Sequence, residues 1–186
     1  MTEIPVALPP ADPELVAEFA AWSAWLPFDV AVAQAPRLPG VYLARRGAAG
    51  PLVYVGMAAE RNGAGLRGRL RVYRTGKGAV SGFGEAAFDR ALGDPEWLRA
   101  RLAELEGGTP SRAKVWAASA LQRTDAWICW ATTSDGLSAS ELEDEVIAAL
   151  EPYDLWNRAR GRRAPELREP AGSTRSGRAI RMSMNL

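Results

Sequence analysis

The chain has 186 residues, of which 47% are hydrophobic and 24% charged, and its formal net charge is +1. This size favours one well-buried domain with extensions, and no apolar run approaches the roughly 18 residues of a membrane-spanning helix. The chain has no histidine and one cysteine, which excludes histidine-based triads, zinc sites and internal disulfides. Hydrolytic chemistry would therefore need carboxylates, tyrosines, arginines, lysines and an oxygen-liganded metal.

The charges are unevenly distributed. Residues 61–84 carry six basic side chains and no acidic one, residues 85–157 are net acidic, and residues 158–186 carry eight arginines against two glutamates. Such clustering makes a local positive footprint suited to a phosphate-bearing partner. The chain shows neither a secretory signal nor a membrane segment, so we expect a cytoplasmic protein in which the lone Cys129 is a buried strand thiol.

Residues 1–38 are expected to form an N-terminal helical extension. Asp12 is a suitable N-cap and Pro13 a suitable first helical residue, and the apolar spacing predicts a helix that reaches about Trp25. Two prolines, Pro36 and Pro39, then separate this extension from the first strand.

Two strands are predicted next, over residues 40–45 and 52–57, joined by the turn-rich segment 47–51. A turn centred near residue 48 pairs residues whose numbers sum to about 96. That register places Tyr42 directly across from Tyr54, on one face of the hairpin. The spacing alone therefore predicts that the two phenols are neighbours.

An arginine-rich helix is predicted over about residues 66–74. Arg69 and Tyr73 share one of its faces because they are four residues apart. A glycine-rich loop over 76–84 follows, and the stretch 85–121 has a helical pattern that glycines and prolines interrupt twice.

The third predicted strand covers residues 125–133, and its apolar character on both faces indicates a central position. A capping box formed by Ser138 and Glu141 predicts the start of a helix that reaches about Leu150 and is ended by Pro152.

On this last helix Glu143 lies in line with Val146, Ile147 and Leu150, which should face the core. An inward-facing carboxylate is costly unless it is paired or binds a cation. Two interpretations stay open on spacing alone: a salt bridge to an arginine at the first turn of the helix, or a metal-binding or catalytic role.

Six landmarks in this order resemble the GIY-YIG nuclease family. They are the two tripeptides Gly40-Val41-Tyr42 and Tyr54-Val55-Gly56, the helix pattern of Leu66, Arg69 and Tyr73, the segment Glu143-Asp144-Glu145-Val146-Ile147, and then Pro152 and Asn157. The resemblance covers residues 39–75 and 125–157. It implies an α+β domain over 39–157, with a small three-stranded antiparallel sheet flanked by helices. The helical segment at about 76–124 would be an insertion that minimal members of the family lack. From its composition we expect residues 158–186 to form a basic, partly disordered tail.

The resemblance also implies a role for each site residue. Glu143 would ligate Mg²⁺ (or Mn²⁺), and Arg69 would hold the scissile phosphate. Tyr54 or Tyr42 would orient or deprotonate the attacking water, and Tyr73 would complete the network around the phosphate and water. A phenol with a pKa of about 10 is a poor base at neutral pH, so arginine or the metal would have to lower it.

Further phosphate or DNA contacts are expected from four basic residues near the helix and from an asparagine that would also brace the site: Arg61, Arg67, Arg71, Lys77 and Asn157. The chain departs from the family at Met57, where many members have a lysine; Arg61 or Lys77 would supply that cation instead. The arginines of the tail would add nonspecific phosphate affinity. A purely solubilising tail is an equally simple explanation.

The leading hypothesis is a divalent-metal-dependent endonuclease that hydrolyses phosphodiester bonds in DNA, with RNA as a further option. Each landmark also has an ordinary explanation: strand aromatics for Tyr42 and Tyr54, a solvated arginine for Arg69, a helix-end cap for Asn157. The main alternative is a GIY-YIG-fold nucleic-acid-binding module without turnover, which the methionine at 57 motivates. A protein-interaction domain is the third, supported only by the tryptophans of the insertion.

Overall fold

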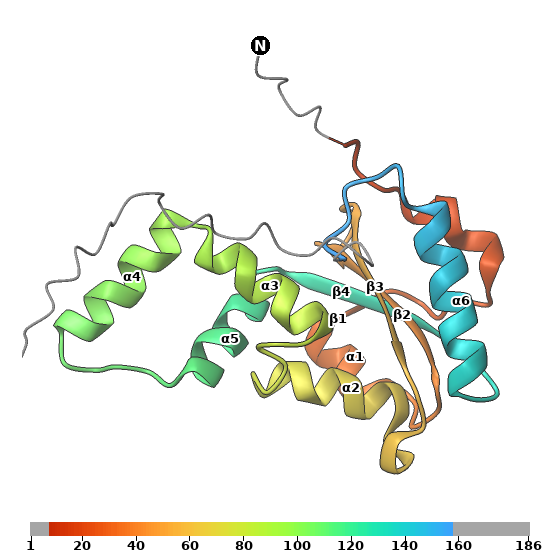
Figure 1. Cartoon of the computed structure of the whole chain (residues 1–186), viewed down its shortest axis with the longest axis horizontal. Helices are drawn as coiled ribbons and strands as arrows, with labels where there is room; N and C mark the ends of the chain where they lie inside the picture. Colours follow the sequence, from red (N-terminus) through yellow and green to blue (C-terminus); the bar gives the residue numbers. More distant parts are fainter. Residues whose placement is uncertain (1–7, 158–186) are drawn as a thin grey trace, which may run out of the picture.

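The computed structural model describes residues 8–157 as a four-stranded antiparallel sheet with helices on both faces (Figure 1). Its strands are β1 (Leu26–Pro27), β2 (Gly40–Arg46), β3 (Leu52–Ala58) and β4 (Ala126–Thr132), in the spatial order β1-β4-β2-β3. The α+β class is as expected. The tail over 158–186 lies outside the described residues.

The expectation of three strands is wrong because the free edge of β4 gains the two-residue strand β1, with Leu26 opposite Ile128. Ser23 continues this edge: its backbone N–H donates to Trp130 O at 2.8 Å, and its Oγ accepts from Trp130 N at 3.1 Å. A strand of two residues is too short to show any periodicity, so the sequence contains no signal for it.

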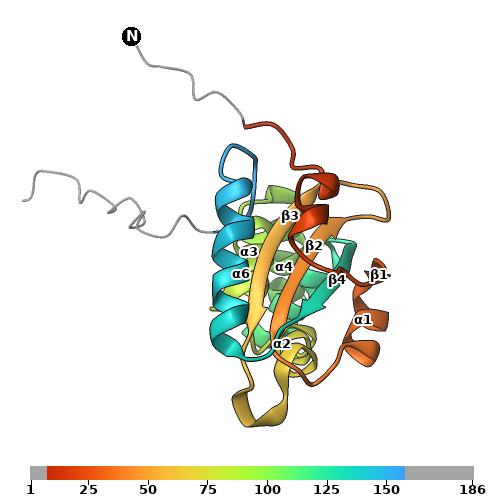
Figure 2. The same ribbon diagram turned by 90° about the vertical axis from the view of Figure 1, so that its right-hand side faces the viewer.

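The two faces of the sheet are covered by different helices (Figure 2). Helices α1 (Phe28–Gln34), α2 (Gly65–Arg74) and α3 (Gly82–Leu92) lie on one face; the 3₁₀ helix η1 (Pro13–Phe19) and α6 (Gly136–Ala149) lie on the other. Alternate residues of β2 divide between the two cores, Tyr42 and Ala44 facing α2 and α3, Val41 and Leu43 facing α6.

The register of the β2–β3 hairpin differs from the prediction by two residues. Tyr42 pairs with Gly56, and Ala44 pairs with Tyr54. The register of strand pairing shifts between Ala44 and Arg45, near the turn end of β2. Tyr42 and Tyr54 are therefore diagonal rather than direct partners. They still share a face, because a shift of two residues preserves the alternation of side chains along a strand.

The N-terminal extension begins as predicted, with the Asp12 carboxylate accepting a hydrogen bond from Glu14 N at 3.0 Å. It is a 3₁₀ helix that ends at Phe19, so the predicted extent to Trp25 is wrong. The indole N–H of Trp22 donates to Val16 O at 2.8 Å, which folds the chain back toward the sheet. Helix α1 follows and was not predicted.

The expected helical insertion contains α3, α4 (Pro95–Glu106) and α5 (Ala113–Gln122), separated at the predicted glycine and proline segments. The predicted loop 76–84 is shorter than expected, because α3 begins at Gly82. Trp97 is buried and packs edge-on against the partly buried Trp116, so these two tryptophans of the insertion belong to a small apolar core.

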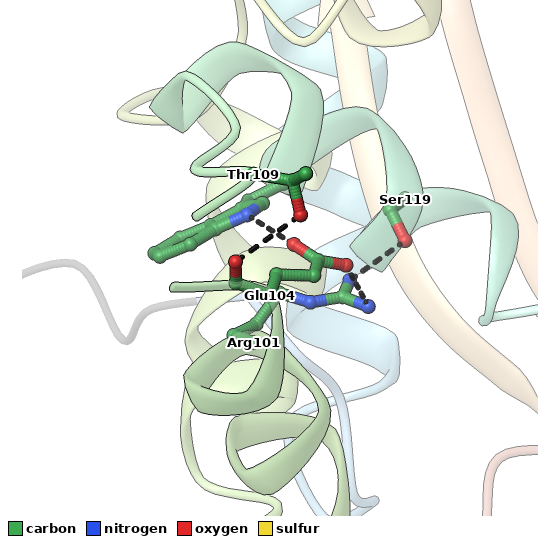
Figure 3. Close-up of polar contacts among 5 residues, drawn as sticks. Arg101, Glu104, Thr109 and Ser119 are labelled. Atoms are coloured by element: carbon green, nitrogen blue, oxygen red, sulfur yellow. Dashed lines mark hydrogen bonds and ion pairs between the residues drawn. The ribbon is translucent and has the colours of Figure 1, made fainter. Parts of the chain in front are cut away.

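Helix α4 lies furthest from the sheet and is attached to α5 by a polar network (Figures 1 and 3). Glu104 forms an ion pair with Arg101 at 2.7 Å and accepts a hydrogen bond from the Trp116 indole at 3.2 Å. Arg101 also lies within 3.4 Å of the Ser119 hydroxyl on α5. These contacts hold α4 in place from within the insertion itself.

Helix α6 begins at Gly136, two residues before the predicted capping box. Its N-cap is Asp135, whose carboxylate accepts from Ser138 N at 2.8 Å. The cap assigned to Ser138 is therefore wrong, since that hydroxyl faces Ser134 instead. No helix within residues 8–157 is long and apolar enough to cross a membrane.

Candidate active site

Three tyrosines from β2, β3 and α2 form the centre of the site. The Tyr42 and Tyr73 hydroxyls are 2.8 Å apart, and the Tyr42 and Tyr54 rings stack with centroids 6.2 Å apart and an interplanar angle of 19°. Gly56 makes this arrangement possible: a Cβ there would lie 2.5 Å from the Tyr42 Cζ. The phenols predicted from the sequence are therefore brought together, with Tyr42 placed above the glycine of the second tripeptide.

Arg69 joins the phenols from α2, with its guanidinium carbon 5.1 Å from the centroid of the Tyr73 ring. The first residue of α3, Gly82, marks where these groups converge. A Cβ at Gly82 would lie 2.8 Å from Arg69 Nη2, 3.3 Å from the Tyr54 hydroxyl and closer still to the Tyr73 hydroxyl. We call Tyr42, Tyr54, Tyr73 and Arg69 the tyrosine–arginine cluster.

The phenols of the cluster are held in their neutral form. Burial is the largest cause that raises the pKa of Tyr42, Tyr54 and Tyr73, and Arg69 opposes it only in part. Proximity to the arginine therefore does not lower these pKa values as the deprotonating role requires. The environment favours phenols that donate and accept hydrogen bonds over phenols that take a proton from water.

The cluster has a buried part and an accessible part. Tyr42 and Tyr73 are each 1% exposed, whereas Tyr54, Arg69 and Glu143 are half-buried. A ligand can thus reach the second group but not the first. Tyr42 and Tyr73 position their neighbours, while Tyr54, Arg69 and Glu143 offer contact atoms.

Glu143 lies on α6 above the fully buried Val146 and Leu150, at the side of the helix that borders β3. Among the causes that raise the pKa of Tyr54, burial comes first, then the Tyr73 phenol, then the negative charge of Glu143. Glu143 and Tyr54 therefore interact electrostatically, although they are 89 positions apart in the chain.

Sequence reasoning missed a second carboxylate, Glu85 in the first turn of α3, whose charge also raises the pKa of Tyr54. It also missed Phe83, which is fully buried and lies 5.4 Å from Tyr54 and 6.1 Å from Tyr73 between ring centroids. The available signal was the short run Gly82-Phe83-Gly84-Glu85, in which an acid in the first helical turn follows glycines that allow close packing.

Two carboxylates whose charges act on the cluster are the residues there that could hold a metal ion. Residues 8–157 contain no group of three or more Cys, His, Asp or Glu side chains able to enclose a metal ion. Mg²⁺ commonly keeps several waters and is held by one or two carboxylates together with substrate phosphates. The charges of Glu143 and Glu85 both raise the pKa of Tyr54, so these two carboxylates are the candidate ligands near the cluster.

Asn157 braces the edge of the sheet beside Tyr54. Its Oδ1 accepts from Val55 N at 2.9 Å, and its Nδ2 donates to Val55 O at 2.7 Å, so the side chain pairs with β3 like a further strand residue. This excludes the alternative of a helix-end cap. Trp156 extends the pairing, since its backbone N–H donates to Val53 O at 2.6 Å.

The other predicted phosphate contacts separate from the cluster. Arg67 Nε donates to Ala35 O at 2.6 Å and holds the end of α1. Arg71 is exposed and, at about 100° per residue, shares the flank of Arg67 rather than that of Arg69. Lys77 is exposed on the loop after α2, and the side chain of Arg61 lies outside what the structure describes.

Met57 packs in the apolar core under α6, with Val55 and Val146, on the opposite face of the sheet from Tyr42. The position that follows the second tripeptide therefore does not face the phenols. The absence of a lysine there removes no cation from the tyrosine–arginine cluster.

Comparison of the chain with protein-family models, curated proteins and solved structures found no match. The GIY-YIG resemblance thus depends on the landmark residues themselves.

Proposed function

We propose that this protein is a divalent-metal-dependent endonuclease that hydrolyses phosphodiester bonds in DNA. One observation carries the proposal: the Tyr54 hydroxyl, the Tyr73 hydroxyl and the Arg69 guanidinium surround a single point at Gly82. The charge of Glu143 acts on the same Tyr54. Residues from β3 and α2 thus bring a fixed cation and neutral hydroxyls to the start of α3, and a carboxylate on α6 acts on one of those hydroxyls through its charge.

Each accessible residue has a role that follows from its chemistry. Arg69 is permanently charged and forked, so it binds the scissile phosphate and offsets the charge that develops on it. Tyr54, which is neutral, orients the attacking water through its hydroxyl. Tyr42 and Tyr73 hold Tyr54 and Arg69 in place through stacking and hydrogen bonding.

Glu143 would hold the metal ion, and Glu85, whose charge also acts on Tyr54, is the second carboxylate that could contribute. When bound, Mg²⁺ or Mn²⁺ supplies Lewis-acid stabilisation of negative charge on phosphate oxygens. The remaining contributions come from the chain: Asn157 fixes β3 beside Tyr54, and Phe83 shields the phenols from bulk water.

A second candidate is a nucleic-acid-binding module of the same fold that does not turn over its ligand. The burial of Tyr42 and Tyr73 favours it, because two of the four cluster residues cannot touch a substrate. It predicts salt-dependent binding without metal-dependent cleavage, and an affinity that does not depend on Glu143.

The deciding experiment measures cleavage of plasmid, branched and single-stranded DNA with Mg²⁺ or Mn²⁺. We expect Glu143→Gln and Arg69→Ala each to lower the cleavage rate by about 100-fold or more. The controls are Glu145→Gln, an exposed acid on the same helix, and Arg99→Ala, an exposed arginine on α4; both should cut like the wild type. Full activity in Glu143→Gln, or no cutting by the wild type, would overturn the proposal. Binding without cutting would select the second candidate.

A further inference from the structure

A hollow of about 370 Å³ lies further along α3 than the tyrosine–arginine cluster. We call it the arginine pocket. It is lined by alanines of α3 and α5 together with three arginines, two aspartates and a tryptophan: Arg46, Arg90, Arg123, Asp94, Asp154 and Trp156. Pockets of about 300–1,000 Å³ are typical of ligand sites.

The three arginines reach the pocket from different elements: Arg46 from the end of β2, Arg90 from α3, and Arg123 from the C-cap of α5. Arg90 is held flat on Trp156, with its guanidinium carbon 4.4 Å from the ring centroid. Trp156 in turn stacks on Phe83 at 6.1 Å and 22°. This stacking limits the rotamers of Arg90, which lowers the entropy cost of binding an anion.

The lining of the pocket has a net charge of +1, because it contains three arginines and two aspartates. Asp94 is already engaged: it pairs with Arg123 and caps α4, accepting from Glu96 N at 2.8 Å and Trp97 N at 3.2 Å. Asp154 is the other acid of the lining, against Arg46 and Arg90. Arg46 and Arg90 repel each other: burial is the largest cause that lowers the pKa of Arg90, the charges of Asp154 and Asp89 oppose it, and the positive charge of Arg46 adds a smaller lowering effect. An anion between the two arginines would relieve that repulsion.

The pocket is connected to the candidate active site by one layer of aromatic rings. Phe83 touches Tyr54 and Tyr73 on one side and Trp156 on the other. Gly82 and Arg90 are eight residues apart on α3, which is roughly 12 Å along the helix at 1.5 Å per residue. A nucleic-acid strand advances about 3.4 Å per nucleotide along a duplex axis, so the two places are a few nucleotides apart.

From this geometry we propose that the arginine pocket binds a backbone phosphodiester of the same strand whose scissile phosphate lies at the tyrosine–arginine cluster. A phosphodiester carries the single negative charge that the pocket lacks, and paired guanidinium groups suit phosphate oxygens. This proposal rests on the proposed function, because it identifies a second contact for the substrate of that site. It also gives the helical insertion a role in holding the nucleic acid.

The test measures binding of fluorescently labelled single-stranded and duplex DNA by anisotropy, in EDTA so that cleavage does not interfere. Arg46→Gln and Arg90→Gln should each weaken binding about 5- to 30-fold, and each should lower the salt slope of log K by about one. The matched control is Arg99→Gln, which removes an equal charge from an exposed position outside the pocket and should change the affinity less than 2-fold. Arg90→Lys should recover part of the affinity, since it keeps the charge but loses the fork.

Wild-type affinity in both Arg46→Gln and Arg90→Gln would overturn the pocket proposal. So would equal losses in the Arg99→Gln control, which would show that overall charge alone matters. Because Arg46 is exposed, its variant should fold normally even if Arg90→Gln is destabilised by the lost stacking on Trp156. Competition by inorganic phosphate at constant ionic strength distinguishes a site for free phosphate from a site for a DNA phosphodiester. If phosphate binding depends on Arg90 but DNA binding does not, the proposal is also overturned.

Failure of the pocket proposal can be distinguished from failure of the nuclease proposal. Loss of DNA binding in the pocket variants, with no cleavage by the wild type, supports the pocket and rejects hydrolysis. Metal-dependent cleavage by the wild type together with unaltered binding and cleavage in the pocket variants supports hydrolysis and rejects the pocket. Absence of DNA binding by the wild type in EDTA rejects the pocket proposal, while the cleavage assay with Mg²⁺ or Mn²⁺ still decides the nuclease proposal.

Discussion

Substitution of Gly82 by alanine tests the convergence of the site groups without any assay of activity. Gly82 has φ +57°, a left-handed conformation that costs an L-residue roughly 1–2 kcal/mol. The added Cβ would also meet Arg69 Nη2 at 2.8 Å and approach the Tyr73 hydroxyl more closely. Neither Tyr73 nor its partner Tyr42 can move easily, because both are 1% exposed and joined by a hydrogen bond.

Gly108 provides the matched control. It has φ +72°, but a Cβ there would meet nothing within 4 Å. Gly108→Ala should therefore lower the free energy of unfolding by the backbone cost alone, about 1–2 kcal/mol. Gly82→Ala should show the same cost plus an overpacking penalty of about 1–3 kcal/mol. The difference between the two variants isolates the crowding at the site from the backbone effect.

Urea unfolding followed by tryptophan fluorescence measures both free energies. For a chain of this length, each kcal/mol corresponds to about 2–4 °C in Tm, so thermal unfolding gives an independent reading. If Gly82→Ala and Gly108→Ala lose the same stability, the Tyr73 hydroxyl and Arg69 do not converge at Gly82. The geometric basis of the proposed function would then be lost.

Three further predictions concern stability. Asp135→Ala should destabilise the protein by about 0.5–2 kcal/mol in urea unfolding, because Asp135 caps α6. Ser138→Ala should leave the free energy of unfolding nearly unchanged. The reverse result would support the capping box at Ser138. Asn157→Leu should cost about 1–3 kcal/mol and speed hydrogen exchange of the Val55 amide, whereas unchanged exchange would show that the edge pairing is absent in solution. Burial raises the pKa of Cys129 to about 12, so its folded pKa exceeds its unfolded value. The contribution of the Cys129 thiol to the free energy of unfolding should be intact below about pH 8.5 and should decline by about 1.4 kcal/mol per pH unit as the pH rises toward 12. Cys129→Ala should flatten this decline of stability with pH. An unaltered slope in the variant would contradict the buried thiol.

Much of the site was predictable because its landmarks lie on regular elements. The shared face of Arg69 and Tyr73 follows from helical spacing alone, and the guanidinium does lie over the Tyr73 ring. The shared face of Tyr42 and Tyr54 follows from the alternation of side chains in a strand, even though the direct pairing was wrong. Register depends on the turn, and the irregularity after Ala44 has no clear sequence signal.

The features that could not be predicted depend on contacts between distant segments. β1 exists only because the edge of β4 is available to Leu26. Asn157 was expected to brace the site, but its pairing with Val55 depends on β3 being an edge strand, which requires the complete strand order. Phe83 contacts the Tyr54 ring and the charge of Glu85 acts on Tyr54 because α3 starts beside the cluster. Local periodicity does not encode this placement.

The burial of the phenols changes how the motif should be understood. In the sequence Tyr42 and Tyr54 are equivalent candidates for handling water, and only their environments distinguish them. Tyr42 is enclosed by Gly56, Tyr73 and the stacked ring of Tyr54, so it has no route to a substrate. Tyr54 is half-buried at the edge of the sheet, where Glu143 acts on it. One tyrosine of the pair therefore serves as a rigid support for the other, and the proposed hydrolysis would take place on the Tyr54 side, within reach of Arg69.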